Sequence, residues 1–320
     1  MTNAPDPDAA LQVDANGRLR HLLTLNGLGR ERIVALLDRA AALRESYRAG
    51  RLATPLAGRT IMNLFFEAST RTRTSFELAA RRLGATVVNF DIASSSTSKG
   101  ESLEDTEATL EAMDADAFIV RHKDNGTPAR FAVHARRAAI LNAGDGNHAH
   151  PTQGLLDLLT IRDRRSDIKG LNVTICGDVR HSRVARSDID GLVALGAAEI
   201  RLSGPAALLP DAAEFPGCRI VEDFDAALEG SDVVIMLRLQ KERMQGALGI
   251  GEADYFTSYG LTSRRLASAR PGAIVMHPGP MNRGIEIADD VADGPQSAIL
   301  DQVANGIFVR MAALAELLGA

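Results

Sequence analysis

A short run near residue 70 concentrates side chains that bind anions. The run reads Ser69-Thr70-Arg71-Thr72-Arg73, and it follows an apolar segment at 60–66. It opens a stretch of helical composition that ends before Gly84. Unpaired amides and the dipole attract anions to a helix start, where arginines are normally disfavoured. Two arginines and three hydroxyls here predict a phosphate site, and the alternative is a capped helix with surface arginines.

Further polar groups follow the other apolar runs that we interpret as strands. They are Lys99 within the polar stretch 94–101, Arg121, His150, Arg183, Arg238 and the run His277-Pro278-Gly279-Pro280. Ligands of parallel α/β sheets bind beyond the carboxyl ends of the strands. The chain has a net charge of −5, so cations gathered at one edge favour a small polyanionic substrate.

The elements that must position these groups alternate along the chain. Strands are expected at 60–66, 85–90, 117–120, 138–141, 171–176, 199–202, 219–221, 233–237 and 273–276. Helices are expected at 30–44, 69–83, 102–113, 128–137, 152–162, 186–195, 224–228 and 297–318. This alternation predicts an α/β fold of two doubly wound domains, each a mainly parallel sheet with helices on both faces, divided near residue 150.

Composition limits the remaining possibilities. Two cysteines, Cys176 and Cys218, provide neither a disulfide framework nor metal spacing, which suits a reducing compartment. The first 14 residues lack a signal peptide pattern, and no apolar run approaches the ~20 residues that span a bilayer. We therefore expect a cytoplasmic protein without a membrane partner. The acidic balance and 4% aromatic content argue against nucleic acid.

Two nucleotide motifs can be set aside. Gly144, Gly146 and Ala149 match a dinucleotide pattern formally, but His150-Pro151 follows where the packing helix should already run. Lys99 is not part of a P-loop, because no glycine precedes it at the required spacing. Zinc-ligand spacing, a catalytic Ser-His-Asp order and a paired-carboxylate signature are also missing from the sequence.

Taken together, the motifs resemble the catalytic chains of the aspartate carbamoyltransferase family. The similarity runs from about Leu23 to the final helix. The motifs that carry it are Ser69-Thr70-Arg71-Thr72-Arg73, Ser98-Lys99-Gly100-Glu101, Arg121-His122, His150-Pro151-Thr152-Gln153, Arg238-Leu239-Gln240 and His277-Pro278-Gly279-Pro280. The resemblance implies that residues 1–150 bind carbamoyl phosphate and that 151–296 bind L-aspartate, with the helix 297–320 packing back on the first domain.

The resemblance also implies the reaction and the residues that perform it. Carbamoyl phosphate and L-aspartate give N-carbamoyl-L-aspartate and phosphate in pyrimidine biosynthesis, without a metal or organic cofactor. The implied catalytic residues are Arg71, Thr72, Lys99, Arg121 and His150. Carbamoyl phosphate would contact these five residues together with Ser69, Thr70, Ser95 and Gln153. L-Aspartate would contact Lys99, Arg183, Arg238, Gln240, Gly279 and Pro280.

The family pattern further implies an assembly and shows two departures. Ser95 and Lys99 would reach the site of a neighbouring subunit, which makes a homotrimer the smallest active unit. A larger assembly with a dihydroorotase-like or regulatory chain is also implied. Ser98 stands where some relatives carry a second lysine, and Gly279 stands where others have leucine. Neither departure changes the expected reaction.

The sequence leaves three alternative functions open. An ornithine carbamoyltransferase shares the first motif, but its pattern has cysteine after the histidine where this chain has Pro278. The second alternative is a catalytically silent assembly subunit. The third is a protein that binds acidic metabolites without chemistry.

Overall fold

The computed structural model describes residues 6–90, 102–239 and 251–320. Ser95 and Lys99, as well as Gln240, lie outside the described residues. The chain divides into two compact units. The first unit comprises Pro5–Leu159 and Ala304–Ala320, and the second consists mainly of Thr160–Val303.

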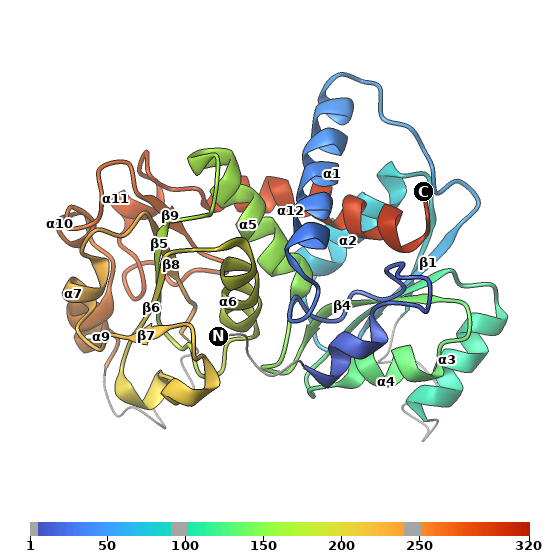
Figure 1. Ribbon diagram of the computed structural model, residues 1–320, viewed down its shortest axis with the longest axis horizontal. Coiled ribbons are helices and arrows are strands. Elements are labelled where there is room, and N and C mark those ends of the chain that lie inside the picture. Colours follow the sequence, from blue (N-terminus) through green and yellow to red (C-terminus); the bar gives the residue numbers. More distant parts are fainter. Residues whose placement is uncertain (1–5, 91–101, 240–250) are drawn as a thin grey trace. The chain divides into compact units, whose positions relative to one another are not determined.

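The first unit is built on a four-stranded parallel sheet with the strand order β2-β1-β3-β4. Its strands are β1 (Thr60–Phe65), β2 (Thr86–Phe90), β3 (Ala117–His122) and β4 (Ala139–Asp145). Its helices are α1 (Arg30–Arg48), α2 (Thr70–Arg82), α3 (Leu103–Ala112), α4 (Thr127–His134) and the start of α5 (Pro151–Arg165). A 3-10 helix, η1 (Pro7–Leu11), precedes them. Figure 1 shows α1 and α2 on one face of this sheet and α3 and α4 on the other.

The second unit carries a five-stranded parallel sheet with the order β7-β6-β5-β8-β9. Its strands are β5 (Asn172–Cys176), β6 (Glu199–Ser203), β7 (Arg219–Ile220), β8 (Val233–Met236) and β9 (Ile274–Met276). Its helices are α6 (Arg183–Leu195), α7 (Phe224–Leu228), α9 (Glu252–Tyr259), α10 (Ser263–Leu266) and α11 (Asp289–Ala292). Short 3-10 turns η4 (Ala206–Leu208) and η5 (Ala212–Glu214) follow β6.

The last helix, α12 (Ile299–Leu317), ends in the first unit. It contacts α1, where Arg39 Nη1 donates to Glu316 Oε2 across 2.8 Å and Arg44 Nη1 donates to Asn305 Oδ1 across 2.7 Å. The rings of Tyr47 and Phe308 lie 5.8 Å apart. The predicted fold class, including the return of the C-terminal helix to the first domain, is confirmed.

Each sheet has a switch point, where the chain changes its direction of travel across the strands. In the first unit the neighbours β1 and β3 mark it, because β2 lies beyond β1 and β4 lies beyond β3. In the second unit β5 and β8 mark it. Loops that leave such neighbouring strands in opposite directions open a crevice at their carboxyl ends.

Most expected elements are present, and the differences have local causes. The strand expected to end at residue 141 continues to Asp145, because the Asn142 amide bonds to the Leu22 carbonyl and extends the ladder. The helix expected to reach residue 137 ends at His134. There the Glu111 carboxylate accepts from the amides of residues 136–138 and draws the chain out of the helix. Helices α9 to α11 were not predicted.

Within the described ranges, none of the helices combines the length and the apolar character that crossing a bilayer would require.

Candidate active site

The run after β1 begins helix α2, as the sequence predicts. Ser69 is the N-cap in an extended conformation, and its side chain makes no capping hydrogen bond. The first turn contains no acidic residue, and it places Arg71, Thr72 and Arg73 around the helix start. Arg71 is exposed and Thr72 is half-buried. The helix start thus presents amides, hydroxyls and guanidinium groups together, a combination that binds a phosphate group.

Arg121 lies at the end of β3, paired in register with Phe65 of β1. Its side chain is buried, with Nη2 donating to Glu67 Oε1 across 2.8 Å and Nη1 donating to the Ala143 carbonyl across 3.1 Å. Glu67 belongs to the loop that leads from β1 into α2. The two contacts fix the guanidinium between the ends of three neighbouring strands, beside the start of α2.

His150 follows β4 and leads into α5. It is 4% exposed, and its carbonyl accepts from the Gln153 amide across 2.9 Å in the first turn of that helix. The preceding turn is closed by Asp145, whose amide bonds to the Ala149 carbonyl and whose carboxylate accepts from the Ala149 amide. Asp145 also accepts from the Gly126 amide across 2.7 Å. The His150 loop is therefore tied to the loop that follows β3.

Gln153 is nearly buried on the first turn of α5. Its Nε2 donates to both carboxylate oxygens of Asp157, at 3.1 Å and 3.2 Å. Asp157 is one helical turn further along and 1% exposed. Residues four apart face the same side of a helix, so Asp157 could have been found from its spacing to Gln153.

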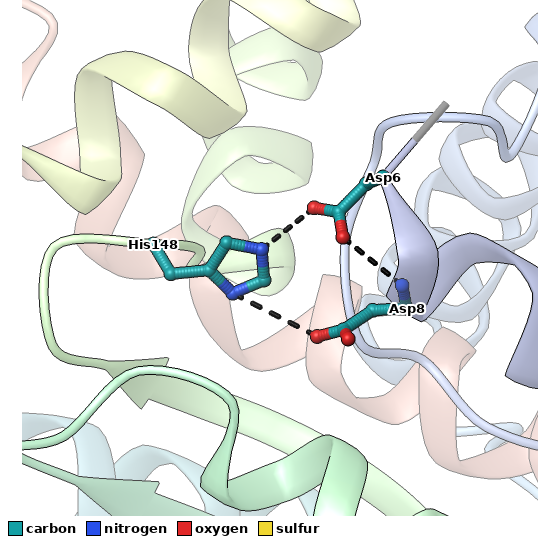
Figure 2. A group of neighbouring side chains, drawn as sticks. All are labelled: Asp6, Asp8 and His148. Atoms are coloured by element: carbon teal, nitrogen blue, oxygen red, sulfur yellow. Dashed lines mark hydrogen bonds and ion pairs between the residues drawn. The ribbon is translucent and has the colours of Figure 1, made fainter. Parts of the chain in front are cut away.

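A second group of titratable side chains adjoins the His150 loop. The described residues bring Asp6, Asp8 and His148 together, so that one ligand atom from each lies within 4.8 Å of the others. Figure 2 shows the His148 ring directed between the two aspartates. His148 Nε2 lies 2.6 Å from Asp6 Oδ2, and Nδ1 lies 3.0 Å from Asp145 Oδ2.

These contacts decide the charge state of the histidine. Hydrogen bonds to Asp145 and Asp6 raise the pKa of His148 to about 10, against the opposing effect of burial. The ring is therefore an imidazolium at neutral pH, and both nitrogens donate protons. The ion pairs of His148 with Asp6 and Asp145 link the N-terminal segment to the His150 loop.

In the second unit, Arg183 takes the first position of α6 after the loop that follows β5. Ser182 caps this helix by accepting from the Ala185 amide across 3.1 Å. The preceding loop is ordered by the buried Asp178, whose Oδ1 lies 2.7 Å from His181 Nδ1. Arg183 itself is half-buried.

Arg238 follows β8, on the other side of the same switch point, and is exposed. The adjacent Leu239 amide donates to Glu286 Oε1 across 2.8 Å. The fully buried Glu286 also accepts from the backbone and side-chain amides of Asn282, at 2.6 Å and 2.7 Å. The segment after β8 is thereby joined to the loop that follows β9. The sequence did not single out Glu286 or Asn282.

The loop after β9 begins with the buried His277, whose Nδ1 accepts from the Gly279 amide across 2.8 Å. Gly279 has a φ of +65°, in the left-handed region that favours glycine. Pro280 follows across a cis peptide bond and is exposed. The backbone of this turn therefore suits glycine at position 279.

The structure brings the candidates together in two groups. Those of the first unit lie at the β1–β3 switch point or in the adjoining loop after β4, and they are Ser69, Thr70, Arg71, Thr72, Arg121, His150 and Gln153. Those of the second unit follow β5, β8 and β9, and they are Arg183, Arg238, Gly279 and Pro280. Glu67, Asn282 and Glu286 were missed, because their roles depend on contacts that only the fold creates, whereas Asp157 was missed although its spacing to Gln153 could have shown it.

Both halves of the chain match known families. Residues 20–163 match the model described as aspartate/ornithine carbamoyltransferase, carbamoyl-P binding domain. Residues 169–317 match the aspartate/ornithine carbamoyltransferase, Asp/Orn binding domain. The chain therefore belongs to the aspartate/ornithine carbamoyltransferase family.

Individual relatives cover almost the whole chain. It is 56% identical to an aspartate carbamoyltransferase catalytic subunit from Xanthomonas euvesicatoria pv. vesicatoria, over 97% of this chain and 99% of the relative. It resembles the crystal structure of Trypanosoma cruzi aspartate transcarbamoylase in complex with carbamoyl phosphate and aspartate. The TM-score is 0.85 at 31% identity, covering 96% of this chain and 98% of that one.

An ornithine carbamoyltransferase from Pyrococcus furiosus is also similar in structure. It has a TM-score of 0.84 at 29% identity, and the match covers 94% of this chain and 97% of that chain. The fold alone therefore does not distinguish the two activities.

Proposed function

We propose that the chain is an aspartate carbamoyltransferase, which transfers the carbamoyl group of carbamoyl phosphate to the amine of L-aspartate. The observation that carries the proposal is the arrangement at the β1–β3 switch point. A helix start without acidic residues lies beside the buried guanidinium of Arg121, which Glu67 holds at 2.8 Å. Full-length identity of 56% to a relative of that name supports aspartate as the acceptor.

The residues of the first unit suit the leaving group and the reacting carbonyl. We assign the phosphate to Ser69, Thr70, Arg71 and Thr72, and the carbonyl oxygen to Thr72, Arg121 and His150. The attacking amine forms a C–N bond while the C–O bond to phosphate breaks, so negative charge develops on the carbonyl oxygen and then on phosphate. Fixed donors at such an oxygen contribute about 3–4 kcal/mol each.

The residues of the second unit suit a dicarboxylate. We assign the two carboxylates of aspartate to Arg183 and Arg238, with Gly279 and Pro280 lining the same substrate. A guanidinium group binds a carboxylate through two parallel hydrogen bonds. Aspartate has two carboxylates for two arginines, whereas ornithine has only one. The Pyrococcus furiosus relative shows that the fold also serves ornithine, so acceptor preference has to be measured.

We also propose an assembly and a proton acceptor. Ser95, Lys99 and Gln240 would complete the site, with Ser95 and Lys99 coming from a neighbouring subunit of a homotrimer in the cytoplasm. A larger assembly with a dihydroorotase-like or regulatory chain extends this proposal. The departing phosphate would take the proton that the amine loses. Light scattering of the native protein tests the trimer, and a monomeric active enzyme would exclude shared sites.

The proposed reaction is tested by phosphate release. Purified protein should release inorganic phosphate from carbamoyl phosphate when L-aspartate is present, and release should saturate with each substrate. Release that needs no amino acid would indicate a hydrolase. Binding of both substrates without release would favour a silent subunit or a binding protein.

A further inference from the structure

Gln153 has its amide orientation fixed by the protein. The NH2 group of its side chain donates to both oxygens of Asp157, at 3.1 Å and 3.2 Å. A carboxylate only accepts hydrogen bonds, so the amide cannot turn over without placing its own oxygen against two acceptor oxygens. The carbonyl oxygen Oε1, at the opposite corner of the planar amide, therefore faces away from Asp157.

The Asp157 carboxylate lies in the interior, close enough to Arg310 of the C-terminal helix for the two charges to influence each other. Asp157 is 1% exposed, and Arg310 of α12 is 4% exposed. Burial, with a smaller effect of Arg121, lowers the pKa of Arg310 to about 10, while the negative charge of Asp157 acts in the opposite direction. Arg310 therefore remains a cation at neutral pH, and it offsets the charge of Asp157 in a region with little water.

The packing around Arg310 leaves its guanidinium little freedom. The group lies 4.9 Å from the ring centroid of Phe76 on α2. A methyl group added at Gly306 would come within 2.5 Å of Arg310 Nη1, so glycine makes room for the cation. A buried cation near Asp157 keeps the carboxylate charged in the interior, and the charged carboxylate gives the Gln153 amide one preferred orientation.

We propose that Asp157, with Arg310 behind it, is a positioning residue that makes Gln153 a hydrogen-bond acceptor for the carbamoyl NH2 group. The inference rests on the proposed function. A carbamoyl nitrogen donates two N–H bonds, whereas the methyl group of acetyl phosphate, which has the same shape, donates none. A fixed acceptor therefore selects the carbamoyl group, while the phosphate half is bound elsewhere.

The test uses Asp157→Asn in the full-length enzyme, because asparagine preserves the shape and removes the obligatory acceptor. Its NH2 group allows Gln153 to turn over and present its own donor to the substrate. We expect the KM for carbamoyl phosphate to rise about tenfold, because the hydrogen bond from the carbamoyl NH2 group to Gln153 Oε1 would be lost. Inhibition by acetyl phosphate should stay within about twofold, because the contacts to its phosphate are intact.

A double-mutant cycle separates positioning from a general structural effect. If Asp157 acts through Gln153, adding Asp157→Asn to Gln153→Ala should change the KM for carbamoyl phosphate no further. Additive effects of the two substitutions would overturn the inference. An equal loss of affinity for carbamoyl phosphate and acetyl phosphate would overturn it as well.

Asp116→Asn is the matched control. Asp116 holds Arg59 and the Thr60 amide at the opposite, amino-terminal edge of the same sheet. This variant should keep both constants within about twofold, even if the protein loses stability. Failure of the wild-type enzyme to turn over the substrates would refute the proposed function. An active wild type with an unchanged KM in Asp157→Asn would refute only the present inference.

Discussion

Arg121 at the end of β3 donates to the Glu67 carboxylate across 2.8 Å, and this ion pair joins two strand ends that are adjacent in the sheet. The guanidinium is buried, whereas Glu67 is about one-third exposed. Because the carboxylate uses Nη2 and the Ala143 carbonyl uses Nη1, the plane of the guanidinium is set before a substrate binds. Preorganised donors need no rearrangement during the reaction, which is the basis of their catalytic effect.

Glu67→Gln tests this preorganisation. Glutamine keeps the size of the side chain but loses the charge-assisted hydrogen bond, so Arg121 gains freedom. We expect kcat/KM for carbamoyl phosphate to fall about tenfold without a comparable change in thermal stability. Steady-state kinetics and thermal unfolding measure the two quantities. An unchanged kcat/KM would show that the ion pair does not orient Arg121 for catalysis.

Arg71→Ala tests the phosphate site at the start of α2. Removing a cation that would stabilise the leaving phosphate should lower kcat by about 100- to 1,000-fold. The fold should persist, because Arg71 is exposed and arginine at a helix start opposes the dipole. The control is Arg81→Ala in the last turn of the same helix, where Arg81 pairs with Glu77. Near-normal turnover in Arg71→Ala would remove the phosphate assignment.

His148 predicts a loss of stability at alkaline pH. Its pKa rises from an ordinary 6.5 to about 10 in the folded protein because of Asp145 and Asp6. A raised folded pKa stabilises the fold fully below pH 6.5, and the contribution disappears as pH rises towards 10. His148→Gln should therefore be less stable than wild type at pH 6, and the difference should vanish near pH 10.

Urea unfolding at several pH values measures this difference. The control is His134→Gln, since His134 is exposed and contacts only the Arg130 carbonyl through its ring among the hydrogen bonds described. That variant should show no comparable dependence on pH. A constant difference between wild type and His148→Gln from pH 6 to pH 10 would argue against the buried imidazolium.

Mixing inactive variants tests the proposed sharing of sites between subunits. Lys99→Ala and His150→Ala should each be nearly inactive. If Lys99 acts in the neighbouring site of a trimer, random exchange of equal amounts restores roughly a quarter of the sites. Phosphate release after reversible dissociation measures the recovery. Exchanged trimers without recovered activity would place Lys99 in the site of its own chain.

The alternation of strands and helices was predictable, because short apolar runs bounded by polar turns indicate buried strands. Residues after the strands, such as Arg121 and Arg238, could also be found, since parallel sheets place ligands at that edge. The extension of β4 to Asp145 could not be predicted, because its polar residues have the composition of a loop. Only the fold shows that the Asn142 amide donates to the Leu22 carbonyl and that the Asp145 carboxylate accepts from the Gly126 amide.

The residues that hold the candidate site residues in place could not be predicted either, for a related reason. Glu286 binds the Leu239 amide from 47 positions away, and Arg310 approaches Asp157 only after α12 returns to the first unit. Such contacts depend on tertiary packing and leave no local pattern. Gln153 and Asp157 are the exception, because a spacing of four residues on a helix brings their side chains together.

Identifying the product tests both the reaction and the acceptor amino acid. The enzyme would be supplied with ¹³C-labelled carbamoyl phosphate and equal concentrations of L-aspartate and L-ornithine, and the products would be followed by NMR. We predict that the label appears in N-carbamoyl-L-aspartate together with one equivalent of phosphate. Label in citrulline, or phosphate released without a carbamoylated amino acid, would contradict the assignment.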